Sequence, residues 1–239
     1  MKKITLSLAF ALLVSSTFLN AQNLEEVLDN YFEVLGQETI LEAKNSQTNG
    51  KMLQSGLEIP FKQYAASPNK FRSEGTFQGM TFIQSFNGEN GWSFNPFAGM
   101  TEAQELNEDE LKVMKVQADY EGVLWNWKDK GHSVTLEGTE EVEGAECHVV
   151  KSVLAGGDIY TSYIDVENFV MIKQSAKITM QGQEIESDTF MSNFQEGDGF
   201  IYPGKIENRV NGQVMSTIVI EEMILGAELD ASLFEKPVI

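Results

Sequence analysis

The spacing of apolar residues predicts where the chain begins with helices. Over residues 23–43, Leu, Val, Tyr and Phe recur every three or four positions, which is the repeat of an amphipathic helix. Gly36 is expected to end the first helix, because glycine readily adopts the left-handed conformation found at helix ends. A shorter helix is expected over 38–43.

Helical spacing returns at Asn107, a predicted N-cap with Glu110 three positions further on. We therefore expect a helical insert over 102–130 that carries Trp125 and Trp127.

Elsewhere the apolar period is two, which is typical of antiparallel strands with one apolar and one wet face. In "MTFIQSF", for example, Met80, Phe82 and Phe86 share one face, and Thr81 and Ser85 share the other. We expect about four strands before the insert and about seven after it. The segments "LQSGLEI", "FQGMTF", "MQGQEI" and "VNGQVM" each place Gly between alternating stretches, which indicates repeated hairpins rather than a true sequence repeat.

A single antiparallel sheet of about eleven strands must have its apolar face covered, and it is too large to stay flat. We predict an α+β domain over 22–239, in which the sheet curls and the few helices close an interior. No linker rich in Pro, Gly or Ser interrupts this range. Periodicity alone does not decide whether side chains or a ligand fill the interior.

The N-terminus has the layout of a secretory signal peptide, residues 1–21. A basic start, Met1-Lys2-Lys3, precedes a mostly apolar stretch that ends before Ala21. The alternative is a membrane-spanning helix, but roughly 16 apolar-leaning residues are fewer than the ~20 that a span needs. Gln22, and not a cysteine, directly follows the predicted cleavage site, so we expect a periplasmic protein with no lipid anchor.

Charge excludes some classes of partner. The 17 basic and 36 acidic residues give a net charge of −19, and without Lys2 and Lys3 the remaining 15 basic residues give −21. Such acidity argues against nucleic acid, whose phosphates it repels, and against tight docking on an anionic membrane.

No constellation of residues indicates catalysis, a metal or a cofactor. Cys147 is the only cysteine, and on a strand its neighbour His148 points to the opposite face, so we expect a buried, unreactive thiol. The other histidine, His132, follows Gly131, where we expect an exposed residue at a helix end. We predict a protein that is not an enzyme, with a hydrolase as the alternative.

Methionine and aromatic residues are plentiful on the apolar faces. "NGENGWSFNPF", residues 87–97, packs three aromatic rings into a turn-rich segment, and nine methionines follow Met1. Met and Phe together make a deformable apolar lining that suits varied ligands. An ordinary core rich in methionine accounts for the composition equally well.

One stretch resembles a known family. The order and spacing of Pro68-Asn69, Phe71, Asn87-Gly88, Trp92 and Asn95-Pro96-Phe97 are similar to those of the LolA-type periplasmic lipoprotein carriers. The closing "YPGKIENRVNGQVMSTIVIEEMILGAELDASLFEKP" is also similar to the last strands and C-terminal clip of that superfamily.

The resemblance implies a half-open β-barrel with lid helices, formed here by the N-terminal helix and the insert over 102–130. It implies a carrier of lipids or acylated lipoproteins, a monomer that receives cargo from an inner-membrane ABC transporter and delivers it to an outer-membrane acceptor. Ser67 stands where the family has an arginine associated with lid closure, and serine lacks that forked set of donors. The candidate cavity-lining residues are Phe71, Met80, Phe82, Phe86, Trp92, Phe94, Met114 and Trp125.

The same scaffold suits a second function. A half-barrel could act as a binding or sensing module that contacts an envelope protein without transport. A single dominant membrane-protein partner would favour sensing, and many acylated lipoproteins would favour carrying.

Overall fold

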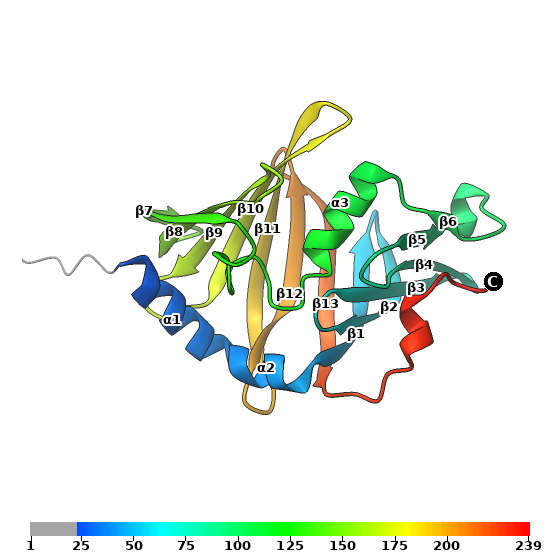
Figure 1. The fold of residues 1–239 in the computed structure, drawn as a ribbon, viewed down its shortest axis with the longest axis horizontal. Coiled ribbons are helices and arrows are strands. Elements are labelled where there is room, and N and C mark those ends of the chain that lie inside the picture. The colour runs from blue at the N-terminus through cyan, green and yellow to red at the C-terminus, as the bar shows by residue number, and fades with distance from the viewer. Residues whose placement is uncertain (1–22) are drawn as a thin grey trace, which may run out of the picture.

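The computed structural model describes residues 23–239, so the predicted signal peptide lies outside the described residues. The described chain forms one antiparallel sheet in the order β6-β5-β4-β3-β2-β1-β13-β12-β11-β10-β9-β8-β7 (Figure 1). The sheet is strongly curved and does not close, as predicted. Its strands are β1 (Asn45–Gln54), β2 (Leu57–Ala66), β3 (Lys70–Phe77), β4 (Met80–Phe86), β5 (Gly91–Phe94), β6 (Gln104–Glu105), β7 (Ser133–Val142), β8 (Ala145–Val153), β9 (Ile159–Asp165), β10 (Met171–Met180), β11 (Gln183–Glu196), β12 (Ile201–Val210) and β13 (Gln213–Leu225).

The strand count of about eleven was wrong, because the sheet has 13 strands in the described residues. Seven of them follow the insert, as expected, but five rather than four precede it, and β6 lies within its predicted range of 102–130. β6 is only two residues long, and β1 opens with the polar run "NSQTN". Polar side chains on that strand, Ser46 and Thr48, are nevertheless buried. The hydrophobic pattern could not reveal a central strand of this kind.

The N-terminal helices form where the sequence predicts them. α1 (Leu24–Leu35) begins at Asn23, whose side chain accepts a hydrogen bond from the Glu26 backbone at 2.9 Å. It ends at Gly36, which has a φ of 73°. α2 (Gln37–Ala43) follows directly. A β-carbon on Gly36 would lie 2.2 Å from the backbone oxygen of Gly199, so both the conformation and the close approach require glycine.

The insert is helical only in part. α3 (Glu108–Gln117) has the predicted capping box between Asn107 and Glu110. The expectation that the helix continues to residue 130 was wrong, because 118–132 is a chain of turns, here called the strap. Left-handed backbone at Gly122, Asn126 and Gly131 interrupts the helix there.

The three α-helices of the described residues lie over one face of the sheet, and they cover different parts of it (Figure 1). Val27 and Leu28 of α1 pack against Val150 and Ile164 in the strands at one end. Met114 of α3 packs against strands at the other end. The middle of the concave face lies between these two contacts.

The C-terminal segment covers the opposite face of β3 and β4, where the family resemblance places a C-terminal clip. A short 3₁₀ helix, η2 (Ala231–Phe234), places Phe234 in a buried position. Arg72 donates to the Leu233 carbonyl at 2.9 Å, and the Ser85 hydroxyl donates to the Glu235 carbonyl at 3.2 Å. Among residues 23–239, no helix is both long enough and apolar enough to cross a membrane.

Candidate functional site: a cavity beneath the strap

The helices and the sheet border a partly open inner cavity of about 620 Å³. Its walls come from α1, α2, α3 and the strap, and its floor comes from the concave faces of β9 to β12. The apolar wall residues include Phe32, Leu35, Ile40, Val113, Val116, Val123 and Leu124, and the floor includes Tyr160, Met171, Gln174, Thr189 and Asn208.

An outer cleft of about 660 Å³ lies on the other side of the strap. It runs between α3 and the β8–β9 connection, from Pro68 to Asp158. Val116, Asp119, Glu121 and Val123 line both spaces. The strap and the last turn of α3 therefore form the partition between the cleft and the cavity.

The wall and floor of the inner cavity differ in polarity. The helices contribute mainly aliphatic and aromatic side chains, whereas the floor contributes polar side chains bonded to one another or to neighbours. Thr189 Oγ1 lies 3.1 Å from Asn208 Oδ1, and Gln174 Nε2 donates to Ser162 Oγ at 3.3 Å. Because these polar groups already have partners, apolar cargo can cover them at a lower cost than it could cover unpaired groups.

Two tyrosines on the cavity wall stay neutral at physiological pH. Burial raises the pKa of Tyr31 and of Tyr120 to about 12 in each case. The Tyr120 hydroxyl also donates to the Ile40 carbonyl of α2 at 3.0 Å.

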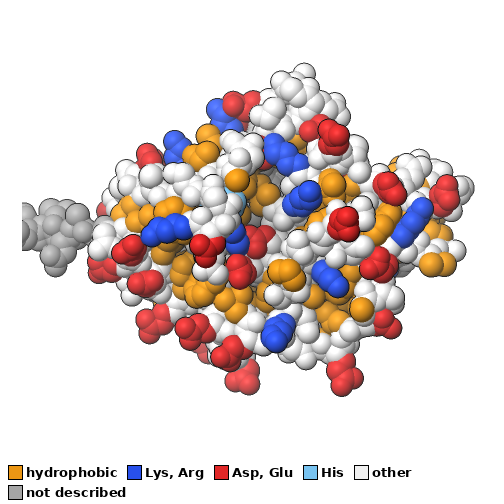
Figure 2. Space-filling model, viewed as in Figure 1, with side chains coloured by type: hydrophobic (Ala, Val, Ile, Leu, Met, Phe, Trp, Pro, Cys, Tyr) orange, Lys and Arg blue, Asp and Glu red, His pale blue; other side chains and the backbone are white. Residues whose placement is uncertain are grey.

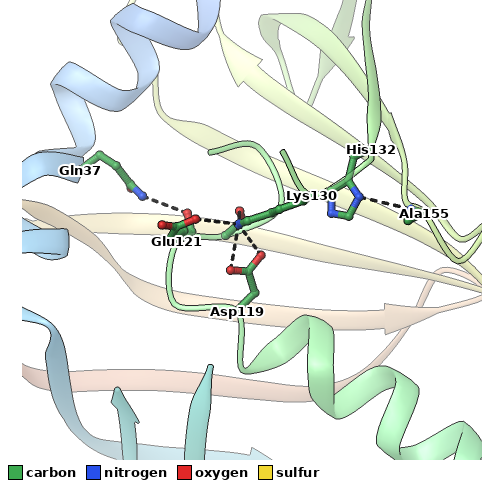
Figure 3. Close-up of polar contacts among 7 residues, drawn as sticks. Gln37, Asp119, Glu121, Lys130, His132 and Ala155 are labelled. Carbon is green, nitrogen blue, oxygen red and sulfur yellow. Dashed lines mark hydrogen bonds and ion pairs between the residues drawn. The ribbon is translucent and has the colours of Figure 1, made fainter. Parts of the chain in front are cut away.

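Lys130 closes the strap on itself (Figure 3). Its Nζ donates to Asp119 Oδ2 at 2.7 Å and to the Gly122 carbonyl at 2.8 Å, and it lies 3.3 Å from Glu121 Oε2. The Lys130 and Asp119 side chains are only about one-fifth exposed. Lys130, near the C-terminal end of the strap, therefore holds the N-terminal end through Asp119, Glu121 and Gly122.

Three further bonds attach the strap to its surroundings. Gln37 at the start of α2 donates to the Glu121 carbonyl at 2.9 Å, as Figure 3 shows. The Tyr120 amide donates to the Pro68 carbonyl at 3.1 Å. At the far end, His132 Nδ1 accepts a hydrogen bond from the Ala155 amide at 3.3 Å.

His132 does not end a helix, so that expectation was wrong. It is partly buried at the end of the strap. Burial first, and the nearby Lys130 second, lower the pKa of this imidazole. The neutral ring is the form that can accept the Ala155 bond.

α3 is tied to the strands on the cleft side. Lys112 Nζ donates to Asp158 Oδ1 at 2.6 Å and to the Thr179 carbonyl at 3.2 Å. Asp109 accepts a hydrogen bond from the Gln181 amide at 2.9 Å. Both contacts lie at the first half of the helix, and they fix it across the outer cleft.

Three of the eight predicted lining residues pack together as core. Phe71, Phe86 and Met114 form a buried cluster with Ala118 beneath α3. They hold the helix on the sheet and lie beside the inner cavity without lining it.

Trp92 and Phe94 do not share a wall with Phe86, contrary to expectation. Trp92 pairs with Ser85 and Phe94 pairs with Ile83, so both rings lie on the face opposite the helices. Phe94 packs in a separate cluster with Ile83.

The remaining three candidates lie further apart. Met80 is exposed at a hairpin tip, and the Phe82 ring fills the space above Gly75. Trp125 contacts Phe32 edge-on, with ring centroids 4.8 Å apart. None of the eight candidates lines the inner cavity or the outer cleft, and contact between any of them and a ligand stays a prediction.

Sequence reasoning missed the residues that line the cavity. The signal was present for Phe32 and Leu35, which belong to the apolar stripe of α1. No pattern marked the polar floor, because residues far apart in sequence form it, and none marked the strap, because its partners Gln37, Pro68 and Ala155 are distant in sequence.

No protein-family model matches the sequence, and no curated protein matches it. Solved structures do match. A LolA superfamily protein from Nitrosomonas europaea aligns with a TM-score of 0.60 at 14% identity, over 90% of this chain and 99% of that chain. A DUF1329 family protein from Desulfovibrio piger aligns with a TM-score of 0.58 at 12% identity, over 87% and 97% of the two chains.

A putative outer membrane lipoprotein-sorting protein domain from Vibrio parahaemolyticus aligns with a TM-score of 0.55 at 11% identity, over 84% of this chain and 96% of that chain. The chain has a LolA-like fold. Identities this low establish the fold alone.

Within this LolA-like fold, Ser67 makes only a backbone contact among the hydrogen bonds of the described residues. Its amide donates to the Lys44 carbonyl at 2.8 Å. The bonds that hold the strap come instead from Gln37, Tyr120 and Lys130. An arginine at position 67 is therefore not needed to attach the strap in this chain.

Proposed function

We propose that the protein is a periplasmic carrier that holds acyl chains of lipids or lipoproteins in the inner cavity for delivery to the outer membrane. The observation that carries this proposal is the partly open cavity of about 620 Å³ with a largely apolar helical wall. That volume falls in the range of about 300–1,000 Å³ that is usual for small-ligand sites. The LolA-like fold supports the same role.

The energetics favour binding of an acyl chain. Each buried methylene contributes about 0.8 kcal/mol, so a long acyl chain supplies on the order of 10 kcal/mol before the cost of ordering it. No three His, Cys, Asp or Glu side chains within residues 23–239 are grouped so as to hold a metal ion. The cavity wall offers apolar contact to cargo.

We infer that cargo reaches the cavity through the outer cleft. The two spaces share their partition, so moving the strap away from Gln37 would join them into one channel. An inner-membrane ABC transporter as donor and an outer-membrane acceptor complete the proposed route. Release then requires an acceptor that binds the acyl chain more tightly.

Two adjacent residues of α1 test the proposal. Leu35 lines the inner cavity, whereas Val34 is 38% exposed. Leu35→Glu places a carboxylate against the acyl chain, and Val34→Glu places the same charge on the same helix in water. Binding of a fluorescent fatty acid is expected to weaken by about tenfold or more in Leu35→Glu and to stay unchanged in Val34→Glu.

Circular dichroism and thermal unfolding of both variants show whether each keeps the fold. Equal probe affinity in two folded variants would contradict the assignment of the inner cavity as the binding site.

A further inference from the structure

A single row of polar side chains crosses the floor of the inner cavity. Directly opposed positions on neighbouring strands from β9 to β13 make up this row, which consists of Ser162, Gln174, Thr189, Asn208 and Ser216. The next opposed row on the same face is apolar, and it consists of Met191, Ile206, Ile218, Met52 and Ile59. The polar row is therefore a local feature of a face that is apolar beside it.

Bonds within the row fix most of its side chains. Besides the Thr189–Asn208 and Gln174–Ser162 contacts, Asn208 Nδ2 donates to Ser216 Oγ at 3.2 Å. These bonds leave the amide oxygen of Gln174 without a donor among residues 23–239. The row is therefore held in place and keeps an acceptor at the cavity.

Tyr160 lies beside the row and holds an unused donor. Its side chain lines the inner cavity and is only 9% exposed. It shares a face of β9 with Ser162 and lies diagonally across from Gln174 of β10, within reach of a long side chain. Its hydroxyl has no hydrogen-bond partner among residues 23–239, and the oxygen is not sealed off from open space. Burial first, and the nearby Asp158 second, raise the pKa of this hydroxyl, so it keeps its proton and can donate.

The inner cavity and the outer cleft differ in their charged side chains. Among the described residues, the inner cavity is lined by the carboxylates of Asp119 and Glu121 and by no Lys, Arg or His. The outer cleft is lined by Lys112, Lys115 and Lys130 as well as by carboxylates. Figure 2 looks onto the face that α3 covers, where Lys and Arg side chains stand around apolar surface and acidic side chains crowd the lower margin. An anionic group therefore meets cations in the cleft and none in the cavity.

We infer that the floor binds the carbonyl group of an acyl ester or amide, with Tyr160 as the donor, and that the part of the cargo inside the cavity is uncharged. This inference rests on the proposed function and names the chemical class of its cargo. In a mostly apolar pocket, a few polar groups fix the orientation of the ligand.

The linkage of an acyl chain supplies the acceptor that Tyr160 lacks. Every acyl chain joined to a head group carries a carbonyl at that end, so a chain packed against the helices can present its carbonyl to the floor opposite. Hydrocarbon laid over the Tyr160 hydroxyl would bury an unmade hydrogen bond, whereas a carbonyl satisfies it. An amide also brings an N–H, which the free oxygen of Gln174 can accept.

A carboxylate or phosphate suits the cavity poorly. Burying an anion is costly unless a cation pairs with it, and the charged groups of the lining are themselves acidic. A free fatty acid is therefore expected to keep its carboxylate on the cleft side, near Lys112 and Lys115, while its chain enters the cavity.

Tyr160→Phe and Tyr163→Phe test the inference on one strand. Tyr163 points to the convex face of β9, where Lys173 Nζ lies 5.0 Å from the centroid of its ring, and it lines neither space. Each change removes only a hydroxyl without a hydrogen-bond partner among residues 23–239. Thermal unfolding of both variants should therefore match that of the wild type.

Four probes of one chain length displace the fluorescent fatty acid: a methyl ester, an N-methyl amide, a methyl ether, which has no carbonyl, and the free fatty acid. Tyr160→Phe is expected to bind the ester and the amide about threefold to tenfold more weakly than the wild type does, the effect of one net hydrogen bond. Its affinity for the ether and for the fatty acid should stay unchanged. Tyr163→Phe should bind all four probes as the wild type does.

Equal ester and amide affinities in Tyr160→Phe and the wild type would overturn the inference and leave the carrier proposal intact. A loss of fatty-acid affinity in Tyr160→Phe would place a carboxylate on the floor and contradict the exclusion of anions. Failure of every probe to bind the wild type would contradict the carrier proposal and this inference together.

Discussion

Lys130 Nζ lies 2.7 Å from Asp119 Oδ2, and this ion pair closes the strap over the inner cavity. The two residues bracket a segment of turns that has no regular hydrogen-bonded ladder of its own. Leu124 packs in the core cluster beside α1, and the rest of the strap is held by a few polar contacts that are open to direct test.

Lys130→Met should loosen the strap. It leaves Asp119 and Glu121 without their cation, and a hydrogen bond to a charged group contributes about 1.5–3 kcal/mol. Hydrogen exchange over 118–132 should become faster, and a fatty-acid probe should exchange faster. Lys128→Met is the control, because Lys128 is 67% exposed and its nearest carboxylate is 3.7 Å away. Equal exchange rates in both variants would show that Lys130 does not hold the strap.

Tyr120→Phe isolates a single bond between the strap and α2. It removes only the hydroxyl that donates to the Ile40 carbonyl. The free energy of unfolding should fall by about 1 kcal/mol, the usual net contribution of one such bond. Denaturant unfolding measures this change. Tyr64→Phe, which alters a hydroxyl with no hydrogen bond among the described residues, should have a smaller effect.

Gly36→Ala should destabilise the fold more than Gly56→Ala does. Both glycines have positive φ, and forcing an L-residue into that conformation costs about 1–2 kcal/mol. Only Gly36 also meets backbone atoms, with the Gly199 oxygen 2.2 Å from the new β-carbon, whereas Gly56 has open space. Comparing the thermal unfolding of the two variants separates the cost of the positive φ, which both share, from the cost of the steric clash with Gly199, which only Gly36→Ala has. Equal losses would show that the close approach of Gly36 to Gly199 is unimportant.

Stability should decline in alkaline solution, in part through Cys147. Burial first, and the nearby Asp165 and Glu146 next, raise the pKa of this thiol from 9.0 to about 11. The folded state therefore favours the protonated thiol. Its contribution is complete below pH 9 and is lost as the pH rises toward 11. Urea unfolding between pH 8 and 11 measures the slope, which Cys147→Ala should reduce.

The sequence predicted features that depend on neighbouring residues. The Gly36 helix end, the Asn107–Glu110 capping box and the alternation of Phe82 and Phe86 against Ser85 all follow from local spacing. Each is confirmed, because each depends on contacts between residues only a few positions apart.

Features that depend on distant residues could not be predicted. Trp125 and Trp127 fall within the predicted helical insert, but contacts from Lys130 to Asp119 and to the Gly122 carbonyl stabilise turns there instead. The bond between Gln37 and Glu121 spans 84 positions of sequence. Such contacts fix the strap where it borders the inner cavity, and no periodicity encodes them.

The central claim, that the inner cavity holds acyl chains, is tested most directly by native mass spectrometry. The protein is purified without detergent from the cells that produce it. The account predicts a mass above that of the polypeptide, with adducts that carry acyl chains and that added fatty acid displaces. A mass equal to the bare polypeptide, with no uptake of added fatty acid, would contradict it.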